Sequence, residues 1–226
     1  MFDLVKKHFG RLEGKSSGAE YDRFERRKVG PAVSLVTKKL EQAHVVFGYQ
    51  GYGRSEENRF AQKLLSIVLG GGMSSRLFTE IREKRGLAYA VGTSTEVYMD
   101  TGSFSTYGGI RVSKVKEAIA VMLEQHQGLV ERKLKISPKE LNKAKEFYKG
   151  YLAIAMENTS EVNMFYGMQG LFLDEIMTPE QVFKKIDSIK VGQLYKAAEE
   201  IFTPQTLNLA IIGPFDDKKV FEKLIS

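Results

Sequence analysis

Apolar residues follow two patterns along this chain, one typical of strands and one typical of helices. Each stretch with one of these patterns predicts a single element of secondary structure. Short stretches rich in valine and aromatic residues, bounded by turn residues, predict strands. Longer stretches whose apolar residues recur at helical spacing predict amphipathic helices. The predicted strands are residues 32–38, 44–49, 88–99, 102–110 and 206–212. The predicted helices are residues 56–69, 76–85, 114–130, 138–157, 160–173, 179–186, 191–202 and 216–225.

Several helix boundaries carry their own signals. Ser137-Pro138-Lys139-Glu140 and Thr178-Pro179-Glu180-Gln181 each predict a capping box with proline at the first helical position. We expect Gly70-Gly71-Gly72 to end the helix before it, because glycine tolerates the left-handed conformations of a helix stop. Ser74 or Ser75 is then expected to cap the next helix through its hydroxyl group.

The order of the elements favours an α+β fold. Strands and helices fall into separate groups, which indicates a largely antiparallel sheet flanked by helices. The turn signal Asp100-Thr101-Gly102 joins two of the strands into a β-hairpin. Residues 1–10 are expected to form a terminal helix left from a preceding domain, residues 11–30 a linker, and residues 31–226 the folded domain.

Composition narrows the classes of function. The chain has 226 residues, a net charge of +6 and no cysteine, so a disulfide framework, a thiolate nucleophile and a zinc–thiolate site are excluded. Its basic residues are interleaved with glutamates, which is typical of solvated helix faces, and no nucleic-acid-binding motif accompanies them. No apolar stretch could span a bilayer, and the N-terminus lacks the apolar core of a signal peptide. We therefore expect a cytoplasmic protein that binds neither nucleic acid nor membrane.

The residues taken alone offer little catalytic chemistry. His8, His44 and His126 do not stand at metal-ligand spacing. His44 lies in a predicted strand, and His126 is expected on a helix surface. There is no G-x-S-x-G nucleophile elbow. The glycines at 70–72 follow a helix and lack the lysine of a P-loop, so they do not indicate a nucleotide site.

One segment, from Ile67 to Gly109, carries a family resemblance. It contains the triple glycine, then Ser-Ser-Arg-Leu, the run Glu-Ile-Arg-Glu-Lys-Arg-Gly-Leu-Ala-Tyr, and later Asp-Thr-Gly-Ser-Phe. It resembles the C-terminal, inactive domain of the M16 zinc peptidases, the family of pitrilysin, insulinase and the mitochondrial processing peptidases. The resemblance implies the fold of a LuxS/MPP-like metallohydrolase half.

The same resemblance implies a function for Arg82 and Tyr89. By spacing alone, Arg82 would be a solvated helix charge and Tyr89 an ordinary strand aromatic. In the family, however, an arginine and a tyrosine at these positions project towards the zinc site of the other half. Arg82 would hold substrate carbonyls in register. Tyr89 would donate a hydrogen bond to the oxyanion that forms when zinc-bound water attacks a peptide bond.

The chain lacks the H-x-x-E-H zinc motif of the family. We therefore expect no cofactor and no peptidase activity in this chain alone, with Zn in a missing or partner half. The implied function is the substrate-side half of a zinc metalloendopeptidase, completing its peptide-binding chamber. The expected partners are the zinc-bearing half and a peptide substrate. Association into a homo-oligomer is a further possibility. The alternative is a non-catalytic assembly or core subunit of the same fold.

Overall fold

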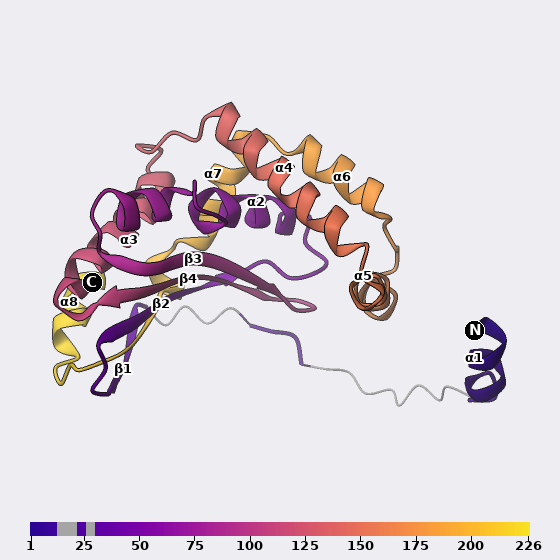
Figure 1. Cartoon of the computed structure of the whole chain (residues 1–226), viewed down its shortest axis with the longest axis horizontal. Coiled ribbons are helices and arrows are strands. Elements are labelled where there is room, and N and C mark those ends of the chain that lie inside the picture. Colours follow the sequence, from indigo (N-terminus) through magenta and orange to yellow (C-terminus); the bar gives the residue numbers. More distant parts are fainter. Residues whose placement is uncertain (13–21, 26–29) are drawn as a thin grey trace.

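The computed structural model describes residues 1–12, 22–25 and 30–226 and contains one five-stranded sheet with helices on one face (Figure 1). The strands are β1 (Ala32–Thr37), β2 (Gln42–Gly51), β3 (Ala88–Val97), β4 (Gly102–Arg111) and β5 (Asn208–Gly213). The α-helices are α1 (Phe2–Phe9), α2 (Arg59–Gly70), α3 (Val115–Val130), α4 (Pro138–Ala155), α5 (Thr159–Phe172), α6 (Pro179–Ser188), α7 (Val191–Ile201) and α8 (Lys219–Ile225). Shorter helical turns are η1 (Phe78–Glu83), η2 (Val112–Lys114) and η3 (Pro204–Thr206).

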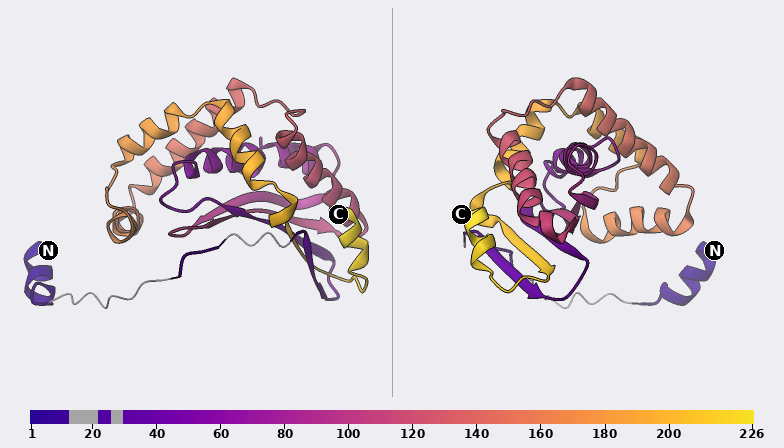
Figure 2. Two further views of the ribbon diagram at one scale, coloured as in Figure 1. Left: turned by 180° about the vertical axis from the view of Figure 1, so that it is seen from behind. Right: turned by 60° about the vertical axis from the view of Figure 1, so that its left-hand side comes forward.

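The sheet is mostly antiparallel, with strand order β1-β5-β2-β4-β3. β2 pairs antiparallel with β4 and β5, and β3 pairs antiparallel with β4, whereas β1 and β5 are parallel. Every second residue of β2 is buried, because successive side chains of a strand point to opposite faces. Apart from α1, the helices gather over one face (Figure 2), and no helix in the described part of the chain covers the other face. These features confirm the predicted α+β class.

The predicted helices are present, with shifts of a few residues at their ends. α2 packs between the sheet and the outer helices, and Leu64, Leu65 and Leu69 are fully buried in the core. Both predicted capping boxes form. The backbone N–H of Glu140 donates to Ser137 Oγ at 3.1 Å, and the N–H of Gln181 donates to Thr178 Oγ1 at 3.4 Å.

The triple glycine ends α2, but not by the predicted left-handed conformation. Gly71 has φ −78°, which any residue could adopt. The need for glycine comes from close approach. A Cβ on Gly70 would lie 2.6 Å from the backbone nitrogen of Thr93 on β3, and a Cβ on Gly71 would lie 2.6 Å from Cα of Ile67. The end of α2 therefore packs backbone to backbone against the sheet.

The predicted serine cap of the next helix is also wrong for Ser75. Its hydroxyl is buried without a hydrogen-bond partner among the described residues. The backbone carbonyl of Ser75 instead accepts the N–H of Thr79 at 3.0 Å. The six-residue turn that follows is a π-helix, in which the spacing of hydrogen bonds differs from that of an α-helix.

The N-terminal part is described only in pieces. The helix expected over residues 1–10 is present as α1, none of whose residues is buried. The expected linker over residues 11–30 lies mostly outside the described residues. In the described part of it, the N–H of Phe24 donates to Asp100 Oδ2 at 2.7 Å. Across residues 1–12, 22–25 and 30–226, no helix has the length and apolar character needed to cross a membrane.

Candidate functional site

The connection from α2 to β3 contains the π-helical turn η1, which carries Arg82. The N–H of Lys84 donates to the carbonyl of Thr79, five residues earlier, at 2.9 Å. Ile81 is fully buried and fixes this turn to the core. π-Helical turns are rare and frequently mark functional sites. Here the turn keeps Ile81 inside while Arg82 is exposed.

A left-handed glycine and three hydrogen bonds hold the turn between Arg82 and Tyr89. Gly86 has φ +57°, a conformation that favours glycine. The N–H of Leu87 donates to the carbonyl of Ile81 at 2.8 Å. From the end of β4, the guanidinium of Arg111 donates to the Gly86 carbonyl at 3.2 Å, and the backbone N–H of Arg111 donates to the Leu87 carbonyl at 3.2 Å. The turn is thus fixed to two elements.

Tyr89 lies in a β-bulge at the start of β3. Ala88 pairs with Ile110 and Ala90 pairs with Gly109, so Tyr89 is the extra residue between them. Ala88 is buried, whereas Tyr89 and Ala90 are both exposed, and the Tyr89 side chain is 57% accessible. A bulge changes the direction of a side chain without ending the strand, and bulges are common beside active sites.

The side chains of Arg82 and Tyr89 form no hydrogen bond or ion pair with the rest of the described chain. The guanidinium of Arg82 lies 4.8 Å from the ring centroid of Phe78, and it makes no ion pair in residues 30–226. Glu80 is occupied by Lys84 at 2.6 Å and by Arg85 at 3.9 Å. The Tyr89 hydroxyl has no hydrogen-bond partner within the described ranges. Their elements are adjacent, but the two side chains make no direct hydrogen bond.

The open face of the sheet beside Tyr89 is polar and has small residues. His44 Nδ1 and the hydroxyl of Tyr107 lie 3.0 Å apart, with their rings stacked. On β3 and β4, the hydroxyls of Ser94 and Ser105 lie 2.8 Å apart. The sequence placed His44 in a strand but gave no signal for its pairing with Tyr107, because that contact depends on the register between β2 and β4.

His126 is buried, so its predicted position on a helix surface is wrong. It is 1% exposed, and its ring nitrogens hydrogen-bond with the Tyr49 hydroxyl at 3.1 Å and with Thr106 Oγ1 at 3.0 Å. Burial lowers the pKa of His126 to about 3 and raises the pKa of Tyr49 above its ordinary value. The missed signal was helical spacing, since His126 follows buried Met122 by four residues on one face of α3.

The described residues do not fit a zinc ion. Nowhere in residues 1–12, 22–25 and 30–226 do three or more His, Cys, Asp or Glu side chains lie close enough together to hold a metal. A catalytic zinc site needs about three protein ligands. His126, the most enclosed histidine, has both ring nitrogens occupied by hydroxyl groups.

Comparison with known proteins assigns the class of domain. The family model described as the peptidase M16 inactive domain matches residues 1–148. The chain therefore belongs to the M16 peptidase inactive-domain family, which confirms the resemblance found in the segment from Ile67 to Gly109.

The curated relatives are longer proteins. An uncharacterized zinc protease of Streptomyces coelicolor is 34% identical over 212 residues, covering 93% of this chain and 46% of the relative. The uncharacterized zinc protease YmxG of Bacillus subtilis is 32% identical, covering 93% of this chain and 50% of its own length. The chain thus spans about half the length of the curated relatives it matches.

A solved structure shows the same fold. The peptidase M16 inactive domain from Pseudomonas fluorescens superposes with a TM-score of 0.81 at 19% identity, covering 95% of this chain and 50% of that chain. At this identity the likeness bears on the fold alone.

Proposed function

We propose that this chain is the substrate-side half of an M16-type zinc metalloendopeptidase and supplies Arg82 and Tyr89 to the active site of a zinc-bearing half. The observation that carries this proposal is that a fixed, irregular connection presents two hydrogen-bond donors that no group in residues 1–12, 22–25 and 30–226 engages. Arg82 is on a π-helical turn and Tyr89 is in a β-bulge, and the turn between them is held by Arg111.

Arg82 suits the task of orienting a peptide. Its guanidinium is a permanent cation with several donors in one plane, so it can hold peptide carbonyls or a carboxylate in a set direction. The ring of Phe78 beneath it limits the directions in which it can point. Because no acidic partner in the described chain occupies it, Arg82 is free to bind a substrate.

Tyr89 suits the stabilisation of developing negative charge. A phenol O–H donor placed beside the scissile carbonyl hydrogen-bonds most strongly when that oxygen becomes an oxyanion. Such a donor accelerates the reaction only if it is held in place before the reaction begins. The pairing of Ala88 and Ala90 on either side of Tyr89 supplies that support.

The sheet offers a surface along which an extended peptide could lie. β3 forms one edge of the sheet, since its strand partner in the described chain is β4 alone. A peptide can add to such an edge through main-chain hydrogen bonds, while neighbouring side chains give specificity. Tyr89 and Arg82 stand at the start of this edge.

The nucleophile would come from the partner. The described residues do not fit zinc, so a metal-activated water would be supplied by a half that carries the H-x-x-E-H motif. This chain would then contribute substrate positioning and charge stabilisation. Neither half alone would complete the chamber.

The test is reconstitution with a zinc-bearing half. Each half alone should leave a fluorogenic peptide intact, and the mixture should cleave it. In the mixture, Arg82→Ala should lower kcat/KM by about 10- to 100-fold, because a hydrogen bond to a charged group is lost. Arg85→Ala, which removes a neighbouring exposed arginine, is the matched control and should change little. A stable complex without hydrolysis would contradict the proposal and favour a non-catalytic assembly subunit.

A further inference from the structure

A second candidate site lies on the helix side of the sheet, away from Tyr89. It is a cavity of about 410 Å³ bounded by α2, α4, α5 and the last part of β3. Thr95 and Val97 of β3 line it. They pair with buried Phe104 and Gly102 of β4, so they face the helices. Thr95 follows Tyr89 by six positions along the strand, which is about 20 Å.

Three cations line this cavity: Arg54, Arg59 and Lys63. All three side chains are half-buried. Arg54 donates to the carbonyl of Val97 at 3.2 Å, and Arg59 donates to the carbonyl of Arg54. No carboxylate in the described chain lies within the 4.0 Å of an ion pair from any of the three. Arg54 and Arg59 are therefore held by hydrogen bonds to backbone carbonyls and not by ion pairs.

The crowding and burial of these cations lower the pKa values of two of them. Burial lowers the pKa of Arg59, and the positive charge of Arg54 lowers it further. Burial also lowers the pKa of Lys63, although the charge of Glu96 opposes that shift. Glu161 lines the cavity as well but does not reach ion-pair distance. A bound anion would relieve the repulsion among like charges that are partly removed from water.

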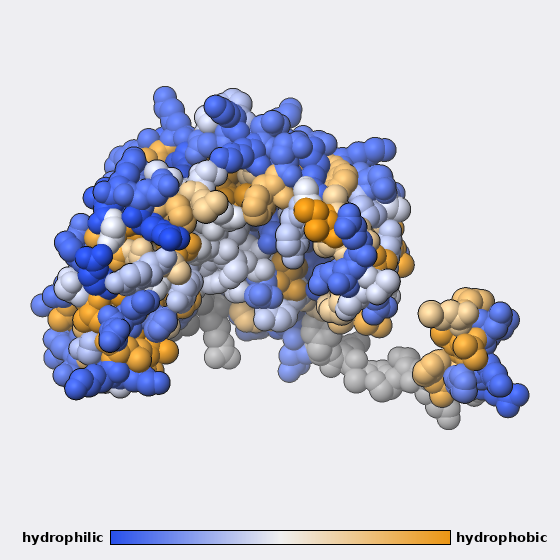
Figure 3. Space-filling view, in the orientation of Figure 1, coloured by the Kyte–Doolittle hydropathy of each residue, from blue (hydrophilic) through white to orange (hydrophobic). Residues whose placement is uncertain are grey.

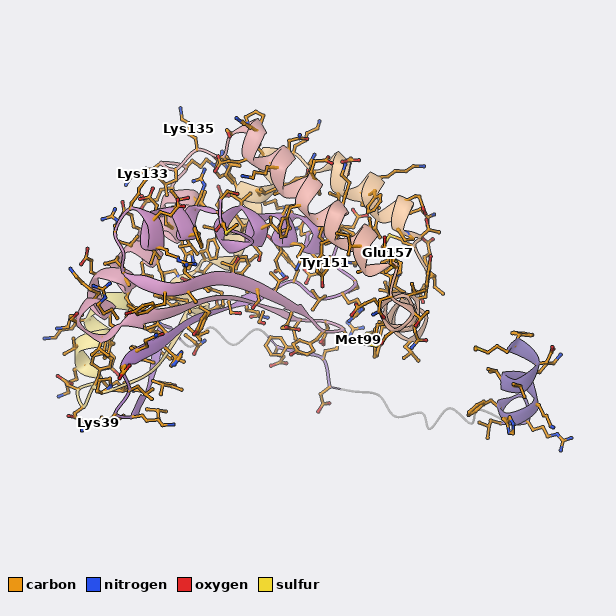
Figure 4. All side chains as sticks on the ribbon, viewed as in Figure 1. Lys39, Met99, Lys133, Lys135, Tyr151 and Glu157 are labelled. Carbon is orange, nitrogen blue, oxygen red and sulfur yellow. The ribbon has the colours of Figure 1, made fainter. Side chains whose placement is uncertain are left out.

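Most of the remaining cavity wall is apolar, although Thr95, Glu161 and Gln169 also line it. It includes methionine side chains, whose flexibility lets a surface fit ligands of different shape, and aromatic rings; these are Met156, Met164, Met168, Met177, Tyr148, Tyr151 and Phe165. The rim is open to solvent, with Tyr151 64% and Met164 53% exposed. Figure 3 shows apolar surface over α4 and α5, and Figure 4 labels Tyr151 on α4 in this region.

We propose that this cavity binds a carboxylate with an elongated apolar body. The carboxylate would lie against Arg54, Arg59 and Lys63, since guanidinium groups bind carboxylates through two parallel hydrogen bonds. The apolar body would lie against the methionines and rings. The volume falls within the usual range for small-ligand pockets, about 300–1,000 Å³. This chemistry occurs in a fatty acid and in the free C-terminus of an apolar peptide. The proposal uses none of the groups around Arg82 and Tyr89.

The experiment is calorimetric titration of the full chain with decanoate below its micellar concentration. We expect saturable binding that is at least about tenfold tighter than that of decanol, which has the same chain without the charge. Arg59→Gln and Lys63→Gln should each weaken binding of decanoate by about tenfold. Lys116→Gln, which removes an exposed cation on α3, is the control and should leave the affinity unchanged.

Two further arms make the result decisive. Met164→Glu, at the exposed rim, should weaken decanoate binding by charge repulsion while the far-ultraviolet circular dichroism stays that of the parent. N-acetyl-Leu-Phe as the free acid, compared with its amide, identifies the source, because a preference for the acid over both its amide and decanoate would indicate a peptide C-terminus. Equal affinity for decanoate and decanol, no saturable binding, or equal weakening by Lys116→Gln would overturn the proposal.

Discussion

Tyr49 and Tyr89 belong to one sheet, yet the structure surrounds their hydroxyl groups in opposite ways. Tyr49 on β2 is buried and its hydroxyl hydrogen-bonds with His126. The ring of Phe202 closes this region by stacking on His126, with centroids 4.5 Å apart. Tyr89 on β3 is exposed, and nothing in the described chain engages its hydroxyl.

This difference in surroundings indicates that the two tyrosines have different roles, one in stability and one in binding or catalysis. In the buried region, every polar side-chain atom of Tyr49, His126 and Thr106 finds a partner inside the protein, as low dielectric requires. At the start of β3, irregular backbone holds polar groups outward, and nothing in the described ranges pairs with them. The first arrangement contributes to stability, and the second is what a binding or catalytic surface needs. Each of the following changes should affect one region and spare the other.

The largest effect on stability is expected from pH. His126 has a pKa of about 3 in the native state, against 6.5 for an ordinary histidine. Below pH 6.5, therefore, His126 binds a proton in the unfolded chain but stays neutral in the native chain. The free energy of unfolding should fall as pH decreases, by at most about 1.4 kcal/mol per pH unit, and most clearly between pH 6.5 and 4.5.

Urea unfolding of the chain across this pH window measures that slope. His126→Gln keeps a polar side chain but cannot titrate, so its unfolding free energy should be nearly constant between pH 6.5 and 4.5. An equal slope in the parent and in His126→Gln would show that the buried region does not set the acid stability.

The second effect comes from removing one hydroxyl in each region. Tyr49→Phe leaves a ring nitrogen of His126 buried without a partner, which should lower the free energy of unfolding by about 1–3 kcal/mol. Tyr89→Phe removes an exposed hydroxyl and should change it by less than about 0.5 kcal/mol. Chemical denaturation of the two variants side by side checks the comparison. Similar losses from both would mean that Tyr89 has a structural partner.

The smallest effect concerns the turn that positions Tyr89. Gly86 has φ +57°, so Gly86→Ala should lower stability by about 1–2 kcal/mol through backbone strain. Gly150→Ala is the control, because Gly150 lies within α4 with open space at its Cβ position. That variant should raise stability by up to about 1 kcal/mol. If both variants raise the melting temperature, the turn is not under the constraint inferred from its φ angle.

The elements and their order could be predicted from the sequence because each has a strong period or a boundary signal. The capping boxes at Ser137 and Thr178 are local and were predicted correctly. Arg82 and Tyr89 were singled out by family resemblance, and their functional assignment stays a proposal. The resemblance identified these two residues but did not indicate which contacts fix their positions.

The remaining features depend on contacts between distant segments. The bulge at Tyr89 depends on pairing with β4, and the turn before it is held by Arg111. The helical spacing could have indicated that His126 is buried, but its two hydroxyl partners come from β2 and β4, and no local pattern reveals them. Arg54, Arg59 and Lys63 are three separate charges in the sequence, and only the packing of α4 and α5 encloses them in one cavity.

The central claim is that Tyr89 acts in the chemical step of a reconstituted peptidase. The most direct measurement is the kcat of the reconstituted enzyme with Tyr89→Phe, beside the control Tyr98→Phe, which removes an exposed hydroxyl near the far end of the hairpin. We predict that Tyr89→Phe lowers kcat by about 10²- to 10³-fold with little change in KM, as loss of an oxyanion donor does. Tyr98→Phe should keep the parent kcat. An unchanged kcat in Tyr89→Phe would contradict the account.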